Sequence, residues 1–242
     1  MTSIFFSEKM GQKLSQEYDE KNKADILIIN EIFSQGVVYA SQKLKEYLGF
    51  EDPQSKFHPA MDTLNEIFLV NFMSFCIERG MEERITTSKM TKQQSLLLGI
   101  DWIWTLSGAD KQIRLQIAVQ TLQMAELLQN ETGPSKEDSL ANWHFKNKSR
   151  FEKLEEFCKL VGHGCVGLFI MFGVPGKPKD IRGVMLDSIN PEKRKNHLSG
   201  ENALRQFVLN TDCFLSTKEM LENCLCKKNG IKEVGKVYIN FL

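Results

Sequence analysis

The sequence lacks a surplus of charge of either sign, because lysine plus arginine and aspartate plus glutamate each number 31 among its 242 residues. Proteins that bind nucleic-acid backbones normally carry a basic surplus, so bulk nucleic-acid binding is not expected. Long hydrophobic runs are missing too: Ile4 to Phe6 is a short run, and residues 64–77, the richest stretch, are interrupted by polar side chains. A secretory signal peptide and a membrane-spanning helix are therefore not expected.

Paired metal-ligand motifs are also missing. The six cysteines form no CxxC pair, and none of the four histidines has another histidine at ligand spacing. We therefore expect no metal site and no cofactor, and we expect reduced thiols in a cytoplasmic protein.

Catalytic motifs are scarce. The stretch from Gly173 to Pro178 resembles a phosphate-binding loop, but its spacing is wrong and no Ser or Thr follows Lys177. There is no GxSxG motif, and no convincing set of Ser, His and acid can be assembled. The sequence favours a protein that is not an enzyme. One alternative stays open, a small enzyme whose site would lie around His163, Cys165 and Lys177.

The first third of the chain reads as helical. Residues 1–23 are polar and are expected to be flexible, whereas apolar residues from Ala24 to Leu48 recur at spacings of one, three and four. A second helix is expected over residues 62–79, with Asp62 as its N-cap. This helix is apolar nearly all round. Its two sides consist of Leu64, Phe68, Phe72 and Phe75, and of Leu69, Val70, Met73 and Ile77.

After Gly99 the period changes from helical to alternating. Residues 102–106 and 113–119 alternate on either side of a turn at 107–110, which predicts a β-hairpin. Further strands are expected at 165–172, 181–187 and 234–241, and further helices at 149–160, 200–209 and 216–227. These elements predict an α+β fold, in which a helical N-terminal third packs with a mainly antiparallel sheet of about five strands and flanking helices.

Three local features complete this outline. Residues 24–242 are expected to form one domain, with a flexible loop at 126–147. The charge run 192–195 is expected to be a solvated loop or to contact anionic lipid. Asp101, which lies among apolar residues, needs a hydrogen-bonding or charged partner.

Several segments together resemble the Rab-15 effector protein family of endosomal regulators. The resemblance is collinear from Met10 nearly to Leu242, and it departs at the nine leading residues and around 125–147. The matching stretches are MGQK at 10–13, QKLKEYLGFE at 42–51, TLNEIFL at 63–69, MTK at 90–92, DWIWT at 101–105, DKQIRLQIAVQTLQM at 110–124, SRFEKLEEFC at 149–158, PGKPKDIRGV at 175–184 and EVGKVYI at 233–239.

The resemblance implies a non-catalytic effector that binds a GTP-loaded Rab GTPase. It further implies a role in recycling transferrin receptor, and a cytoplasmic protein held peripherally on early or recycling endosome membranes. An effector needs an exposed apolar patch with a polar rim. The candidates for Rab binding are Val70, Met73 and Ile77 on the second helix, and Trp102 and Trp104 on the hairpin. A scaffold subunit indifferent to nucleotide is a further alternative, and the oligomeric state is left open.

One motif bears on the membrane. Met10 to Ser15 matches the N-myristoylation pattern M-G-x-x-x-[ST], which acts only when its glycine is N-terminal. Gly11 is therefore a candidate lipid-anchor site if translation starts at Met10.

Overall fold

The computed structural model describes residues 2–50, 52–54, 56–123, 148–174, 177–189, 198–226 and 238–241, with side chains from Lys23 onward. The loop expected at 126–147 and the charge run at 192–195 lie outside these described residues.

A mixed sheet forms the centre of the molecule. Among the described residues it has seven strands, in the order β1-β2-β3-β4-β5-β7-β6. The β3–β4 and β6–β7 pairs are parallel, and the remaining pairs are antiparallel. The α+β class is therefore confirmed, with seven strands where the sequence predicted about five. The strands are β1 Ile85–Lys89, β2 Trp102–Ser107, β3 Ile113–Gln123, β4 Cys165–Val174, β5 Lys177–Met185, β6 Phe214–Ser216 and β7 Tyr238–Asn240.

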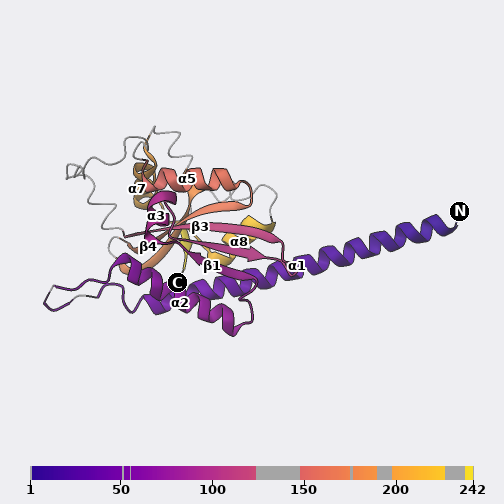
Figure 1. Ribbon diagram of the computed structural model, residues 1–242, viewed down its shortest axis with the longest axis horizontal. Coiled ribbons are helices and arrows are strands. Elements are labelled where there is room, and N and C mark those ends of the chain that lie inside the picture. Colours follow the sequence, from indigo (N-terminus) through magenta and orange to yellow (C-terminus); the bar gives the residue numbers. More distant parts are fainter. Residues whose placement is uncertain are drawn as a thin grey trace.

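Helices cover both faces of this sheet (Figure 1). On one face lie α1 (Thr2–Leu44), α2 (Met61–Glu78) and α8 (Thr217–Cys226), whose buried side chains join a single cluster with β2, β3 and β4. On the other face lie α3 (Lys92–Leu98), α5 (Arg150–Val161) and α7 (Gly200–Asn210), which pack on a second cluster. The molecule thus has three layers, with the sheet in the middle.

The first helix starts earlier than the sequence predicted. We expected a flexible segment over 1–23 and a helix from Ala24, but α1 begins at Thr2. The segment contains no proline and several residues with high helix propensity, including Glu, Lys and Gln, so the helix can continue without an apolar face. Figure 1 shows this N-terminal part of α1 extending beyond the sheet.

Aromatic packing joins α1 and α2 to the sheet. The ring of Phe33 on α1 meets the rings of Phe72 and Trp104 edge to face, at centroid distances of 5.3 and 5.0 Å. Gly36 lets α2 come close, because a Cβ atom at this position would lie 3.2 Å from the Phe72 ring. These contacts fix which face of α2 is buried.

The ends of α3 follow the sequence signals, whereas the start of α2 does not. Thr91 and Gln94 form the expected capping box at the start of α3, and Gly99 ends that helix in the left-handed conformation, at φ 73°. The expected N-cap of α2 was wrong: Ala60 occupies that position and makes no side-chain cap, whereas Asp62 lies in the first turn. A carboxylate in the first turn still interacts favourably with the helix dipole.

Candidate functional site

The Asp101 carboxylate accepts four hydrogen bonds. Its Oδ1 atom accepts from the Ser95 hydroxyl and the Arg150 guanidinium, each at 2.7 Å. Its Oδ2 atom accepts from the Thr121 backbone N–H at 2.7 Å and from the Thr121 hydroxyl at 2.8 Å. The carboxylate therefore ties α3 and α5 to strand β3. These hydrogen bonds and the ion pair with Arg150 are the partners that the sequence analysis expected for Asp101, and their role is structural.

An exposed apolar stripe runs along the outer face of α2. Val70, Met73 and Ile77 are exposed to 57%, 36% and 59%. Their spacing of three and four places them on one side of the helix, opposite the buried Phe68 and Phe72. We call these three residues the α2 stripe. Since each side chain is in contact with solvent, a partner can reach all three.

Charged and aromatic side chains surround the α2 stripe. Lys89 pairs with Glu66 near one end. At the other end the Arg79 guanidinium lies over the Phe75 ring, 5.0 Å from its centroid, and Tyr39 of α1 packs against the same ring at 5.5 Å. An apolar centre with a polar and aromatic rim is the composition typical of a protein–protein interface.

The two tryptophans lie elsewhere. Trp102 and Trp104 are both fully buried, and their rings pack against Phe68 of α2. Leu69, which the sequence grouped with the outer side of α2, is also buried. Of the five predicted Rab-binding residues, only the α2 stripe is accessible. The two indole rings belong to the core between α1, α2 and the sheet.

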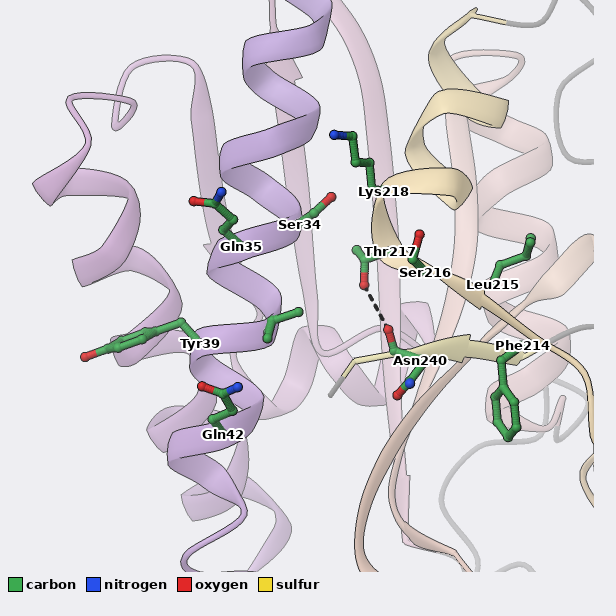
Figure 2. A pocket seen from close by; sticks show the side chains of 11 residues that line it. Ser34, Gln35, Tyr39, Gln42, Phe214, Leu215, Ser216, Thr217, Lys218 and Asn240 are labelled. Carbon is green, nitrogen blue, oxygen red and sulfur yellow. Dashed lines mark hydrogen bonds between the residues drawn. The ribbon is translucent and has the colours of Figure 1, made fainter.

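A groove of about 520 Å³ separates α1 from the last strand of the sheet (Figure 2). Figure 2 shows side chains from α1 on one wall and from β6 and the start of α8 on the other. The groove runs beside the sheet edge, since within the described ranges β6 is the last strand and pairs with β7. No histidine, cysteine or carboxylate is found among the described residues that line it, which favours contact with a partner over acid–base chemistry. They are Ser34, Gln35, Val38, Tyr39, Gln42, Phe214, Leu215, Ser216, Thr217, Lys218 and Asn240.

Polar contacts fix the walls of this groove. The Thr217 hydroxyl donates to the Asn240 carbonyl at 3.3 Å, which holds the start of α8 against β7. Across the groove, the Lys218 ammonium lies 2.6 Å from the Glu31 carboxylate of α1. The hydrogen bond from Lys218 lowers the pKa of Glu31, and the same bond raises the pKa of Lys218. Among the described residues, Lys218 is the cation that lines the groove, and it is engaged by Glu31 of α1.

The residues proposed for the alternative enzyme site are not all brought together. His163 and Cys165 line one cavity of about 450 Å³, but Lys177 does not line it. Cys158 of α5 and Cys224 of α8 line it instead. Sequence spacing gave no signal for this grouping, because Cys158 and Cys224 belong to different layers. Across the part of the chain that the structure describes, no three His, Cys, Asp or Glu side chains are arranged to hold a metal ion.

In the described ranges, no helix is both long enough and apolar enough to cross a bilayer. Gly11 lies within α1, and its backbone is helical.

Comparison with known proteins identifies a family. The model of the Rab15 effector family matches residues 14–241. The chain is also 51% identical to the Rab15 effector protein of the mouse, Mus musculus, over 233 residues, which cover 96% of this chain and all of that relative.

Proposed function

Because the chain belongs to the Rab15 effector family, we propose that it is a non-catalytic effector that binds the GTP-loaded form of Rab15 or a related Rab GTPase. The two switch loops of such a GTPase are ordered by the γ-phosphate and magnesium, and they loosen after hydrolysis. A protein distinguishes the two states only through contacts that exist in one of them. The task therefore requires a matching surface rather than an active site.

The α2 stripe is the observation that carries this proposal. Val70, Met73 and Ile77 form an exposed apolar row on a helix whose opposite face is anchored in the core. A helix fixed in this way is preorganised, so binding costs little backbone ordering. We assign the switch-region contact to this face of α2.

A nucleotide comparison tests the proposal. Rab15 loaded with a non-hydrolysable GTP analogue should retain the full-length chain on a resin, and Rab15 loaded with GDP should retain much less. Equal retention by both forms would favour the nucleotide-indifferent scaffold. No retention by either form would remove Rab15 as the partner.

We further propose a role in receptor recycling at endosomes. A Rab effector acts where its GTPase resides, so the chain would be a cytoplasmic protein held peripherally on early or recycling endosomes. Cells depleted of the protein should return internalised transferrin receptor to the surface at an altered rate. A version with polar residues in the α2 stripe should fail to restore that rate, whereas the unmodified chain should restore it.

A lipid anchor at Gly11 is part of the proposal only for a chain that starts at Met10. A single myristoyl group gives marginal, reversible membrane binding, which suits a protein that also docks on a membrane-bound GTPase. Mass spectrometry of the cellular protein's N-terminus tests this directly. An N-terminal peptide that begins at Met1 would rule the anchor out.

A further inference from the structure

The loop between α1 and α2 exposes two phenylalanine rings to solvent. Phe50 and Phe57 are exposed to 49% and 59%, and their rings meet edge to face with the centroids 6.1 Å apart. Figure 1 shows this loop projecting from the molecule at the end opposite to the N-terminal part of α1. Exposed apolar groups that gather in one place mark contact sites for proteins or membranes.

The carboxylate of Asp52 fixes the shape of this loop. Its Oδ1 atom accepts a hydrogen bond from the Gln54 backbone N–H at 3.0 Å. Its Oδ2 atom accepts from the backbone N–H groups of Lys56 and Phe57, at 2.9 and 3.0 Å. Because one side chain ties these backbone groups together, the loop needs little ordering before it meets a partner.

The start of β5 brings lysines to the same place. A Cβ atom added to Gly49 would lie 3.7 Å from Lys179 Cε and 3.8 Å from Pro178 Cβ, so this part of β5 packs beside the loop. Lys177 and Lys179 are both exposed. Two segments that are far apart in the chain therefore form one surface. We call it the loop-tip surface, and it consists of Phe50, Lys56, Phe57, Lys177 and Lys179.

The loop-tip surface lies in a region with a local surplus of positive charge. Residues 43–58 and 177–179 contain five lysines and three acidic residues, in a chain whose formal net charge is zero. One of the acidic residues, Asp52, is already engaged by three backbone N–H groups of the loop. Opposite charges attract across an interface, so this region favours an anionic partner.

We propose that the loop-tip surface docks on an anionic lipid surface. Phe50 and Phe57 enter the interfacial layer, and the lysines beside them face the lipid headgroups. Binding of this kind strengthens with the apolar area that is buried and with the attraction of basic residues to anionic lipid. A projecting loop can reach a flat lipid surface before the rest of the molecule meets it.

This inference rests on the peripheral membrane position proposed above, and it does not rest on the Rab contact. None of the residues of the loop-tip surface belongs to the α2 stripe. Gly11 lies near the far end of α1, so the contact is also separate from the candidate lipid anchor.

Co-sedimentation with vesicles tests the proposal on the full-length chain, which starts at Met1 and carries no lipid anchor. The chain should sediment with vesicles of equal parts phosphatidylcholine and phosphatidylserine, and much less with vesicles of phosphatidylcholine alone. High salt should weaken this binding, because it screens the lysines. Equal sedimentation with both kinds of vesicle, or with neither, would overturn the proposal even if every variant failed to fold.

Variants assign the binding to the loop-tip surface. The combined change Phe50→Ser and Phe57→Ser should weaken binding to the anionic vesicles at least about tenfold. The combined change Lys177→Gln and Lys179→Gln should also weaken it at least about tenfold. Phe57→Trp should preserve binding, because tryptophan suits the interfacial layer. Full binding by the folded double-serine variant would contradict the assignment.

The combined change Leu96→Ser and Leu97→Ser is the matched control. These two neighbouring residues of α3 are as exposed as the two phenylalanines, and they lie outside the loop-tip surface. The control variant should bind vesicles like the unmodified chain, and an equal loss in it would overturn the proposal. A dimer that the double-serine variant loses, in a chain that does not bind vesicles, would assign the rings to a second copy instead.

Rab binding by the same variants separates this inference from the proposed function. The double-serine variant should lose vesicle binding and still bind GTP-loaded Rab15. An unmodified chain that binds Rab15 but no vesicles would overturn the lipid contact alone. An unmodified chain that binds anionic vesicles but no Rab15 would support the lipid contact and remove the Rab proposal.

Discussion

Asp101 shows how one carboxylate can hold a layer in place. It receives hydrogen bonds from α3, α5 and β3, and its side chain is only 14% exposed. Removal of a buried acceptor leaves its donors without a partner, which costs more than the bond itself contributed. We expect Asp101→Ala to lower the free energy of unfolding by about 3 kcal/mol. Urea denaturation monitored by tryptophan fluorescence measures this loss.

Glu156→Ala is the control for this prediction. Glu156 pairs with Lys148 at 2.8 Å, but about half of each side chain is exposed. Exposed ion pairs contribute about 0.5 kcal/mol or less. A loss for Asp101→Ala no larger than that of Glu156→Ala would mean that the Asp101 network does not stabilise the fold.

Gly99 is required at the end of α3 for two reasons. Its φ of 73° disfavours a side chain, and an added Cβ atom would lie 2.4 Å from the carbonyl oxygen of Arg150. Gly80 has a similar φ of 66°, but an added Cβ atom there would meet nothing within 4 Å. We expect Gly80→Ala to cost about 1 kcal/mol and Gly99→Ala to cost about 3 kcal/mol. Thermal unfolding of the two variants compares them, and equal costs would contradict the close packing of α3 on α5.

The two faces of α2 should respond differently to truncation. Phe72 is fully buried between Phe33 and Trp104, whereas Ile77 is exposed. Phe72→Ala should therefore cost about 3–5 kcal/mol of unfolding free energy, and Ile77→Ala about 0.5 kcal/mol. Chemical denaturation measures both values. A large cost for Ile77→Ala would show that the α2 stripe belongs to the core and is unavailable to a partner.

Elements with a strong local signal were predicted correctly. The alternation at 102–106 and 113–119 gave the β2–β3 hairpin, and Thr91 and Gln94 gave the start of α3. The strand β1 was missed, because only Ile85 in the sequence ITTSK is buried. The strand β6 was missed because it has three residues. Both strands lie at the edges of the sheet, where a short strand with few buried side chains gives no alternating hydrophobic pattern to recognise.

The pairing of strands that are far apart in the chain could not be predicted from the sequence. The parallel pairing of β3 with β4 joins residues that are separated by α5 and by a long intervening segment, and no local pattern specifies it. For the candidate site, periodicity predicted two apolar sides of α2, but it did not show which side is exposed. The burial of each side chain in the structure shows this. It leaves Val70, Met73 and Ile77 accessible and places Leu69 in the core. The grouping of Cys158 and Cys165 around one cavity depends on how α5 ends against β4, which sequence spacing does not show.

Across the whole molecule, the layered packing leaves the outer face of α2 exposed. Helices α3, α5 and α7 cover one face of the sheet, and α1 and α2 cover the other. Helix α2 packs against α1 and the sheet, so that the outer face of α2 meets solvent. The ion pair of Arg84 with Asp25, at 2.5 Å, further fixes α1 to the turn before β1. The α2 stripe therefore lies on a helix that is packed into the core, and for the proposed Rab contact this means that little backbone ordering is needed on binding.

The most direct test is a titration of Rab15 in both nucleotide states onto the full-length chain. We expect the GTP form to bind at least about tenfold more tightly than the GDP form. The combined variant Val70→Ser, Met73→Ser and Ile77→Ser should stay folded and weaken binding of the GTP form about a hundredfold. Leu209→Ser, at an exposed apolar residue of α7 in the opposite layer, should bind like the unmodified chain. Equal affinity for the two nucleotide states, or full affinity in the folded triple variant, would contradict the account.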